Sequence, residues 1–177
     1  MAVLWRLFRF ASAGILAAAL LCAQGPTEYD VKAAFLLNFT KFIEWPPTAF
    51  ASPDAPFRIC IAGEDPFGDA LDKMVEGERV GSHKLVVYRI QRGSTTACQV
   101  VFYSKADKNV AQSIARDGPS VLTVGETDAF LREGGAIRFV LDHNRVRFDV
   151  NQTAAQKAGL QISSKLLNVA RTVEGRQ

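Results

Sequence analysis

The hydrophobic positions of the chain first follow a helical period and then change to short runs typical of strands. The helical part begins after Thr27, a residue suited to an N-cap, and Asp30 three positions later favours the first turn. We expect the helix to stop before Pro46, because proline disfavours helical geometry in the residue that precedes it. The aromatic residues that recur along it at helical spacing, and that we expect in the core, are Phe35, Phe39, Phe42 and Trp45.

A connector at Trp45–Pro56, which holds four of the seven prolines, separates this helix from an alternation of strands and helices. Apolar runs predict buried strands at Phe57–Ala62, Leu85–Ile90, Gln99–Tyr103 and Ser120–Val124. The predicted helices are one capped by Asp65 with Pro66 at its first position, one at Asn109–Ala115, and a short one at Asp128–Arg132 that ends at Gly134-Gly135.

The last third of the chain predicts a hairpin followed by two helices. Ala136–Leu141 and Arg145–Val150 flank a turn, and the second arm alternates apolar with charged residues, so one face should be buried and the other wet. Helices are expected at Gln152–Ala158 and Ser164–Val169. Strands separated by helices favour a single-domain α/β sandwich, with a mixed, mostly parallel sheet, helices on both faces and a C-terminal hairpin.

The first 23 residues are typical of a cleaved secretory signal peptide. A basic start with Arg6 and Arg9 leads into the apolar run Phe10–Leu21, which is too short to span a bilayer, a crossing of roughly 20 residues. We expect cleavage after Ala23 and export to the periplasm. Cys22 is a weak candidate for lipid attachment. The predicted organisation is a signal peptide at 1–23, one domain at 27–170 and a frayed tail at 171–177.

Without the leader, two cysteines remain, Cys60 and Cys98. A pair in an oxidising compartment is most simply a disulfide, and closing a loop of 38 positions stabilises a fold by about 4 kcal/mol. The alternative is two separate buried thiols. The full chain has 21 basic and 18 acidic residues without a basic stripe, which argues against a nucleic-acid partner.

The pattern of reactive side chains predicts no catalytic, metal or cofactor site. His83 and His143 lie in predicted turns and lack ligands at metal-binding spacing. A serine nucleophile with a lysine base could be formed by Ser163-Ser164-Lys165. However, a helix cap followed by an exposed lysine accounts for these three residues.

Two other features are candidates for binding. The loop with Gly63, Asp65 and Gly68 follows a predicted strand, where α/β proteins often bind ligands, although its acidic residues would repel a phosphate; a capped turn is the default interpretation. The first helix is also apolar around much of its circumference. It is therefore covered on several sides or docks on another chain, and the candidate interface residues are Leu36, Leu37 and Ile43.

Five blocks of the sequence together resemble the YfiR/HmsC-like family of periplasmic proteins, over about Tyr29 to Ala170. They are Tyr29–Pro46, Ile59–Gly68, Cys98–Phe102, Val121–Val124 and the segment from Gly134 to Leu167. The resemblance implies a dimeric α/β protein that is not an enzyme and that holds an inner-membrane diguanylate cyclase inactive through its periplasmic region. It also implies an outer-membrane lipoprotein that sequesters the repressor.

Cys60 and Cys98 match a disulfide of that family, but a second cysteine pair known in a relative has no counterpart after Cys98. The function that the family resemblance predicts is repression of a diguanylate cyclase by direct contact, which lowers cyclic di-GMP and biofilm formation. The alternative is a periplasmic small-ligand sensor or carrier without a cyclase partner.

Overall fold

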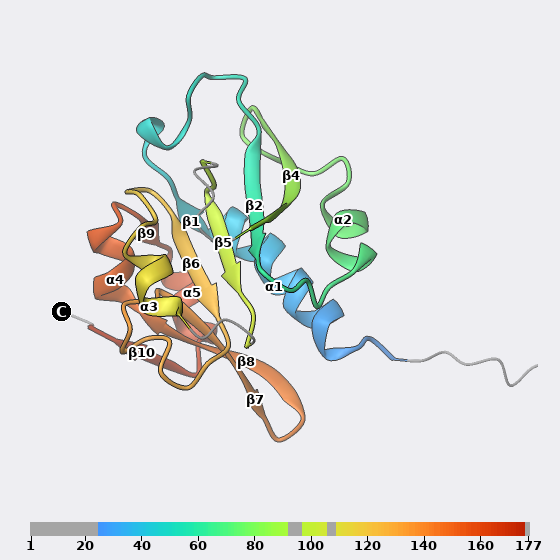
Figure 1. Ribbon diagram of the computed structural model, residues 1–177, viewed down its shortest axis with the longest axis vertical. Coiled ribbons are helices and arrows are strands. Elements are labelled where there is room, and N and C mark those ends of the chain that lie inside the picture. Colours follow the sequence, from blue (N-terminus) through green and yellow to red (C-terminus); the bar gives the residue numbers. More distant parts are fainter. Residues whose placement is uncertain (1–24, 92–96, 106–108, 176–177) are drawn as a thin grey trace, which may run out of the picture.

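The computed structural model describes residues 25–91, 97–105 and 109–175, which form an α/β sandwich around one large mixed sheet (Figure 1). The predicted leader, including Cys22 and the cleavage point after Ala23, lies outside the described residues. Within those ranges, no helix has the length and apolar character that a membrane crossing requires. The predicted fold class is confirmed.

The large sheet has the strand order β10-β8-β7-β6-β5-β2-β4-β3. Strands β4, β2, β5, β6 and β7 run parallel, whereas β3 and β8 pair antiparallel with their neighbours β4 and β7, and β10 pairs parallel with β8. The bounds of its strands are β2 Phe57–Ala62, β3 Arg79–Val80, β4 His83–Ile90, β5 Val100–Tyr103, β6 Leu122–Gly125, β7 Ile137–Asp142, β8 Arg145–Asn151 and β10 Thr172–Glu174.

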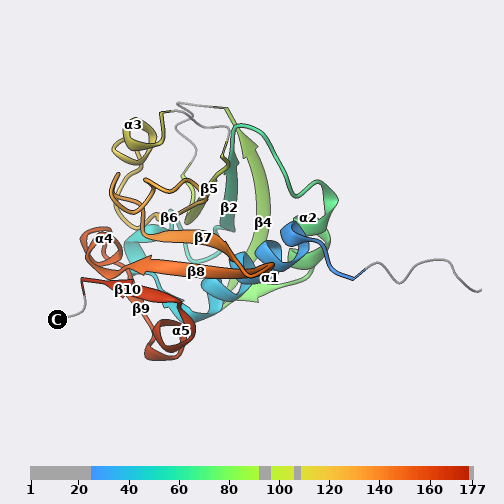
Figure 2. The same cartoon turned by 90° about the horizontal axis from the view of Figure 1, so that it is seen from below.

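Helices cover both faces of this sheet, and Figure 2 shows α3 on the side away from α5. Helices α1 and α2 share the larger core with one face, and α3 contributes to a smaller apolar cluster on the other. The bounds of the helices are α1 Glu28–Phe42, η1 Pro47–Ala49, α2 Asp69–Val75, α3 Val110–Ile114, α4 Gln152–Lys157 and α5 Ser164–Val169.

Helix α1 begins as predicted and ends earlier than predicted. Thr27 and Asp30 form a reciprocal capping box at its start. It stops at Phe42 rather than Trp45, because the next two residues form strand β1 (Ile43–Glu44), which pairs antiparallel with β9 (Gln161–Ile162). This pairing joins segments far apart in the sequence, so the local helical period could not predict it.

Two other predicted helices are corrected. Helix α2 starts at Asp69 after Gly68, whose φ is +53°, and Asp65 instead accepts a hydrogen bond from the N–H of Phe67 at 2.8 Å within a turn. Residues 128–134 form consecutive turns rather than a helix. The buried ring of Phe130 holds these turns, because it lies against Gly125 and Gly135 so closely that a Cβ at either position would fall within 2.3 Å of ring atoms.

The C-terminal hairpin forms as predicted, with positive φ at His143 and Asn144 in a two-residue type I′ turn. Its charged face is not solvent-exposed throughout. Asp149 is buried and accepts hydrogen bonds from Arg138 and Arg171, both at 2.6 Å. The tail expected to fray from residue 171 instead continues as β10, which Arg171 ties to Asp149.

Candidate protein-binding surface

Three of the large apolar side chains with the greatest exposure lie along one strip of the molecule. Phe42 at the end of α1 is 38% exposed, Leu141 in the β7–β8 hairpin 52%, and Val169 at the end of α5 57%. Most surface apolar residues are isolated, but these belong to a series that follows α1 between the hairpin and α5. We call the series the α1 strip; it comprises Val31, Phe35, Phe42, Leu141, Val146 and Val169, together with the buried Leu166, which lines its second depression.

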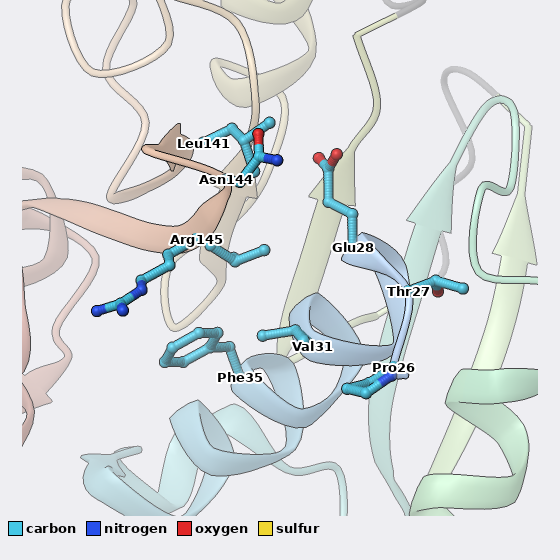
Figure 3. A pocket seen from close by; sticks show the side chains of 9 residues that line it. Pro26, Thr27, Glu28, Val31, Phe35, Leu141, Asn144 and Arg145 are labelled. Atoms are coloured by element: carbon cyan, nitrogen blue, oxygen red, sulfur yellow. The ribbon is translucent and has the colours of Figure 1, made fainter. Parts of the chain in front are cut away.

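The first part of the α1 strip is a depression of about 520 Å³ between α1 and the tip of the hairpin. Figure 3 shows Val31 and Phe35 projecting from α1 into the space that separates the helix from Leu141 and Arg145. The hairpin geometry places these groups, because Leu141 and Val146 are paired residues of β7 and β8 and therefore point to the same face.

The second part is a depression of about 300 Å³ between α1 and α5, with Phe42 and Val169 at its walls and Asn38 and Lys165 as its polar members. Phe35 lines both depressions and joins them. The ring of Phe35 also lies 5.3 Å from the ring of Phe148 in an edge-to-face arrangement, so the strip continues directly into the core.

The chemistry of the α1 strip suits association by apolar burial. Charged groups lie at its rim, where Glu28, Arg145 and Lys165 flank the apolar walls. An apolar centre with a polar rim is the usual arrangement of a protein-binding surface. The described residues include no group of three or more histidine, cysteine, aspartate or glutamate side chains placed to bind a metal ion.

Two of the residues predicted as the interface, Leu36 and Leu37, lie on the other side of the same helix, and the third, Ile43, lies in β1. Leu36 and Ile43 are buried in the main core, and Leu37 is half-buried against it. The helix is thus covered on several sides by its own chain, one of the two alternatives left open by the sequence. Phe42, expected in the core, is exposed instead, because helical spacing cannot distinguish two adjacent apolar stripes of one helix.

The candidate ligand loop around Gly63, Asp65 and Gly68 uses its polar groups internally. The guanidinium of Arg89 donates to the carboxylate of Asp65 at 2.8 Å and to the carbonyl of Gly68 at 2.9 Å, and it also pairs with Asp72. Phe67 packs edge to face against Tyr29 and Phe102 and occupies the core side of the loop. The default interpretation, a capped turn, accounts for these contacts, and a ligand there stays a prediction.

A network of charged side chains, largely buried, lies between the start of α1 and the end of β6, next to this loop. The Nζ of Lys32 lies 3.2 Å from the carboxylate of Glu126, contacts Glu28, and is 4.4 Å from the centre of the Tyr29 ring. Burial, and then the nearby charge of Glu126, raise the pKa of Tyr29 to about 12. This network ties the start of α1 to the loop after β6 and keeps the neutral phenol through the physiological range.

Two other sequence predictions concern cysteine and serine. Cys60 and Cys98 form a disulfide, which confirms the simpler of the two alternatives. The hydroxyl of Ser163 accepts a hydrogen bond from the N–H of Leu166 at 3.3 Å, so it is the cap of α5. The α1 strip was missed because its residues come from four elements, α1, β7, β8 and α5, that only the tertiary fold brings together.

A family model described as YfiR/HmsC-like matches residues 29–171, which include all five α-helices of the described chain except the first residue of α1. That family is known for regulation of diguanylate cyclases in the periplasm, and it is a regulatory rather than a catalytic family. Because the match extends over most of the chain, the protein belongs to the YfiR/HmsC-like family.

Proposed function

We propose that the protein represses an inner-membrane diguanylate cyclase by binding its periplasmic region, and that it thereby lowers cyclic di-GMP and biofilm formation. The observation that carries the proposal is the α1 strip, an exposed apolar surface in a member of a regulatory family. Such surfaces mark sites of protein association, because their burial against a partner removes apolar area from water.

The mechanism is a shift of population. A repressor that binds only the inactive conformation of the cyclase pulls the equilibrium toward that conformation. Moving a receptor from almost fully active to almost fully inactive takes about 5.5 kcal/mol of difference in binding free energy. The α1 strip supports a contribution of that kind, since burying apolar surface is worth roughly 25 cal/mol per Å² before the costs of association.

We propose in addition that the protein is a homodimer and that an outer-membrane lipoprotein competes for it. Two linked contacts between a dimeric repressor and a dimeric receptor would raise the avidity above that of either contact. Sedimentation of the exported protein tests the dimer. A sedimentation mass of one chain across the concentrations present in the periplasm would contradict it.

The test in cells uses deletion of the gene and its restoration. Deletion should raise cyclic di-GMP, and the wild-type gene should return it to the starting level. The double variant Phe42→Lys/Val169→Lys places two charges on the α1 strip and should leave cyclic di-GMP high, although both positions are exposed and the protein should fold. Normal export of the variant is checked by immunoblot.

Tyr88→Lys is the matched control, because Tyr88 is 41% exposed and lies on β4, outside the α1 strip. It should restore repression fully. Unchanged cyclic di-GMP after deletion, in a strain that exports the protein, would refute the cyclase as the partner. Full repression by the double variant would refute the α1 strip as the contact surface.

A further inference from the structure

The main-chain groups of β8 alternate between its two edges, and the structure settles which residues face which edge. The N–H of Asn151 donates to the carbonyl of Ala136 at 2.8 Å, beside β7, and the type I′ turn pairs Arg145 with Asp142 on the same side. Arg147 and Asp149 follow the same alternation. The main-chain groups of Val146, Phe148 and Val150 therefore point to the outer edge of the sheet.

Strand β10 covers only part of that outer edge. It pairs with Asp149–Asn151, and the N–H of Arg171 donates to the carbonyl of Phe148 at 2.8 Å. No strand of the described residues pairs with Arg145–Arg147 on this side. The N–H and carbonyl of half-buried Val146 thus lie on an edge that no described strand pairs with, which we call the open edge; it ends at Phe148, which is buried.

The open edge lies over the α1 strip. The side chains of Val146 and Phe148 point to the face that α1 covers, where Phe35 lies between the two depressions. Figure 2 shows β8 reaching past the end of β10 toward α1. A segment added along this edge would place alternate side chains in the two depressions on either side of Phe35.

The opposite face of the open edge is basic. Arg147 is exposed there. Arg145 is exposed at the tip of the hairpin, where it also borders the first depression of the α1 strip. Asp149, the next residue on that face, is already bound by Arg138 and Arg171. A second copy of β8 added antiparallel to this edge would set arginines against arginines, which is unfavourable. An incoming segment with acidic residues on that face would be attracted instead.

We propose that the open edge of β8 binds an extended segment of the protein's partner as an added strand. The segment has bulky apolar residues at alternate positions, which enter the α1 strip, and acidic residues between them, which face Arg145 and Arg147. This inference rests on the proposed function for the nature of the partner. Main-chain hydrogen bonds fix the position of such a strand, and its alternate side chains give affinity and specificity.

The first test measures amide hydrogen exchange by NMR on the full exported protein. The amide of Val146 should exchange rapidly in the free protein, whereas the amides of Arg145 and Arg147 are protected by β7. The probe is a synthetic seven-residue peptide with leucine at its second, fourth and sixth positions and glutamate between. Its addition should slow exchange at Val146 at least tenfold.

Two control peptides separate the parts of the proposal. Replacing glutamate by lysine should abolish protection, and so should scrambling the leucine and glutamate positions. Equal protection by all three peptides would refute the proposed recognition. Protection of Val146 in the free protein that increases with protein concentration would show that a second copy occupies the edge, and would also overturn the proposal.

Variants test the two kinds of contact. Val146→Pro removes the N–H that faces the open edge and leaves the ladder with β7 intact, so peptide binding should weaken at least tenfold. Val146→Ala keeps this N–H and controls for loss of the side chain. If Val146→Pro fails to fold, the exposed pair Arg145→Glu/Arg147→Glu serves instead and should reverse the preference in favour of the lysine peptide.

Failure of this inference can be distinguished from failure of the proposed function. Suppose that deletion of the gene raises cyclic di-GMP but that the periplasmic region of the cyclase leaves exchange at Val146 unchanged. The open edge is then not the contact surface, and the proposed function as a repressor still holds. If that region protects Val146 but deletion leaves cyclic di-GMP unchanged, the open edge is a binding site and repression is refuted.

Discussion

The two faces of the sheet are stabilised in different ways. The face under α1 buries six phenylalanines in one continuous core: Phe39, Phe57, Phe67, Phe102, Phe139 and Phe148. The smaller apolar cluster on the other face contains Phe130 and the disulfide between Cys60 and Cys98. The comparison teaches that apolar area is sufficient on one face, whereas the other depends on a covalent link and on close approach of a ring to glycines.

The largest effect should follow removal of the disulfide. Replacing Cys60 and Cys98 by alanine should lower the free energy of unfolding by about 4 kcal/mol, because the unfolded chain loses the constraint of a 38-residue loop. Urea unfolding of the double variant measures the loss. A loss below about 1 kcal/mol would show that the smaller cluster is stable without its link, and the contrast between the faces would disappear.

An intermediate effect is expected where glycine allows close approach. In Gly135→Ala the new Cβ would lie 2.1 Å from the ring of Phe130, and the resulting overpacking should cost about 1–3 kcal/mol in the free energy of unfolding. Gly118→Ala is the matched control, since no heavy atom lies within 4 Å of the position that its new methyl group would take. Equal stability of the two variants would mean that Phe130 is not confined.

Acid should weaken the attachment of the edge strand β10 to β8. Burial alone would raise the pKa of Asp149, but hydrogen bonds from Arg171 and Arg138 outweigh it and hold the pKa at about 2. Because this pKa lies below the ordinary 3.8, the stabilisation is present above about pH 4 and is lost as the pH falls toward 2. Unfolding of Asp149→Asn in urea should therefore change less across this range than that of the wild type, whereas Asp54→Asn should follow the wild type.

The smallest effect on stability should come from the α1 strip. Phe42→Gln should change the free energy of unfolding by only about 0.5 kcal/mol, because Phe42 is 38% exposed and lies outside the main core. Thermal melting of the variant measures this. A clearly larger loss would place Phe42 with the core residues and weaken the assignment of the α1 strip to binding.

The features that the sequence predicted well are those set by neighbouring residues. The capping box of Thr27 and Asp30 and the alternation of the hairpin both act within a few positions. The features it missed depend on distant partners. Ile43 leaves the helix to pair with β9, and Phe130 holds a turn that local pattern assigned to a helix.

The burial of the candidate interface residues could not be predicted for the same reason. Leu36 and Phe42 are both apolar residues of α1, and only the positions of the sheet and α5 decide which of them is covered. The disulfide was predictable because two cysteines remained beyond the leader. The tail was not, because β10 depends on the ion pairs of Arg171 with the buried Asp149 rather than on its own composition.

Trp45 gives the molecule a built-in optical reporter. Its indole N–H donates to the carbonyl of Gln99 at 3.2 Å, and its ring packs edge to face on Phe57 of the larger core, beside the entrance to β5. The other tryptophan is Trp5, within the first 23 residues. The intrinsic fluorescence of the exported chain would then come from this one junction, and its emission would report how the larger core holds the start of β5.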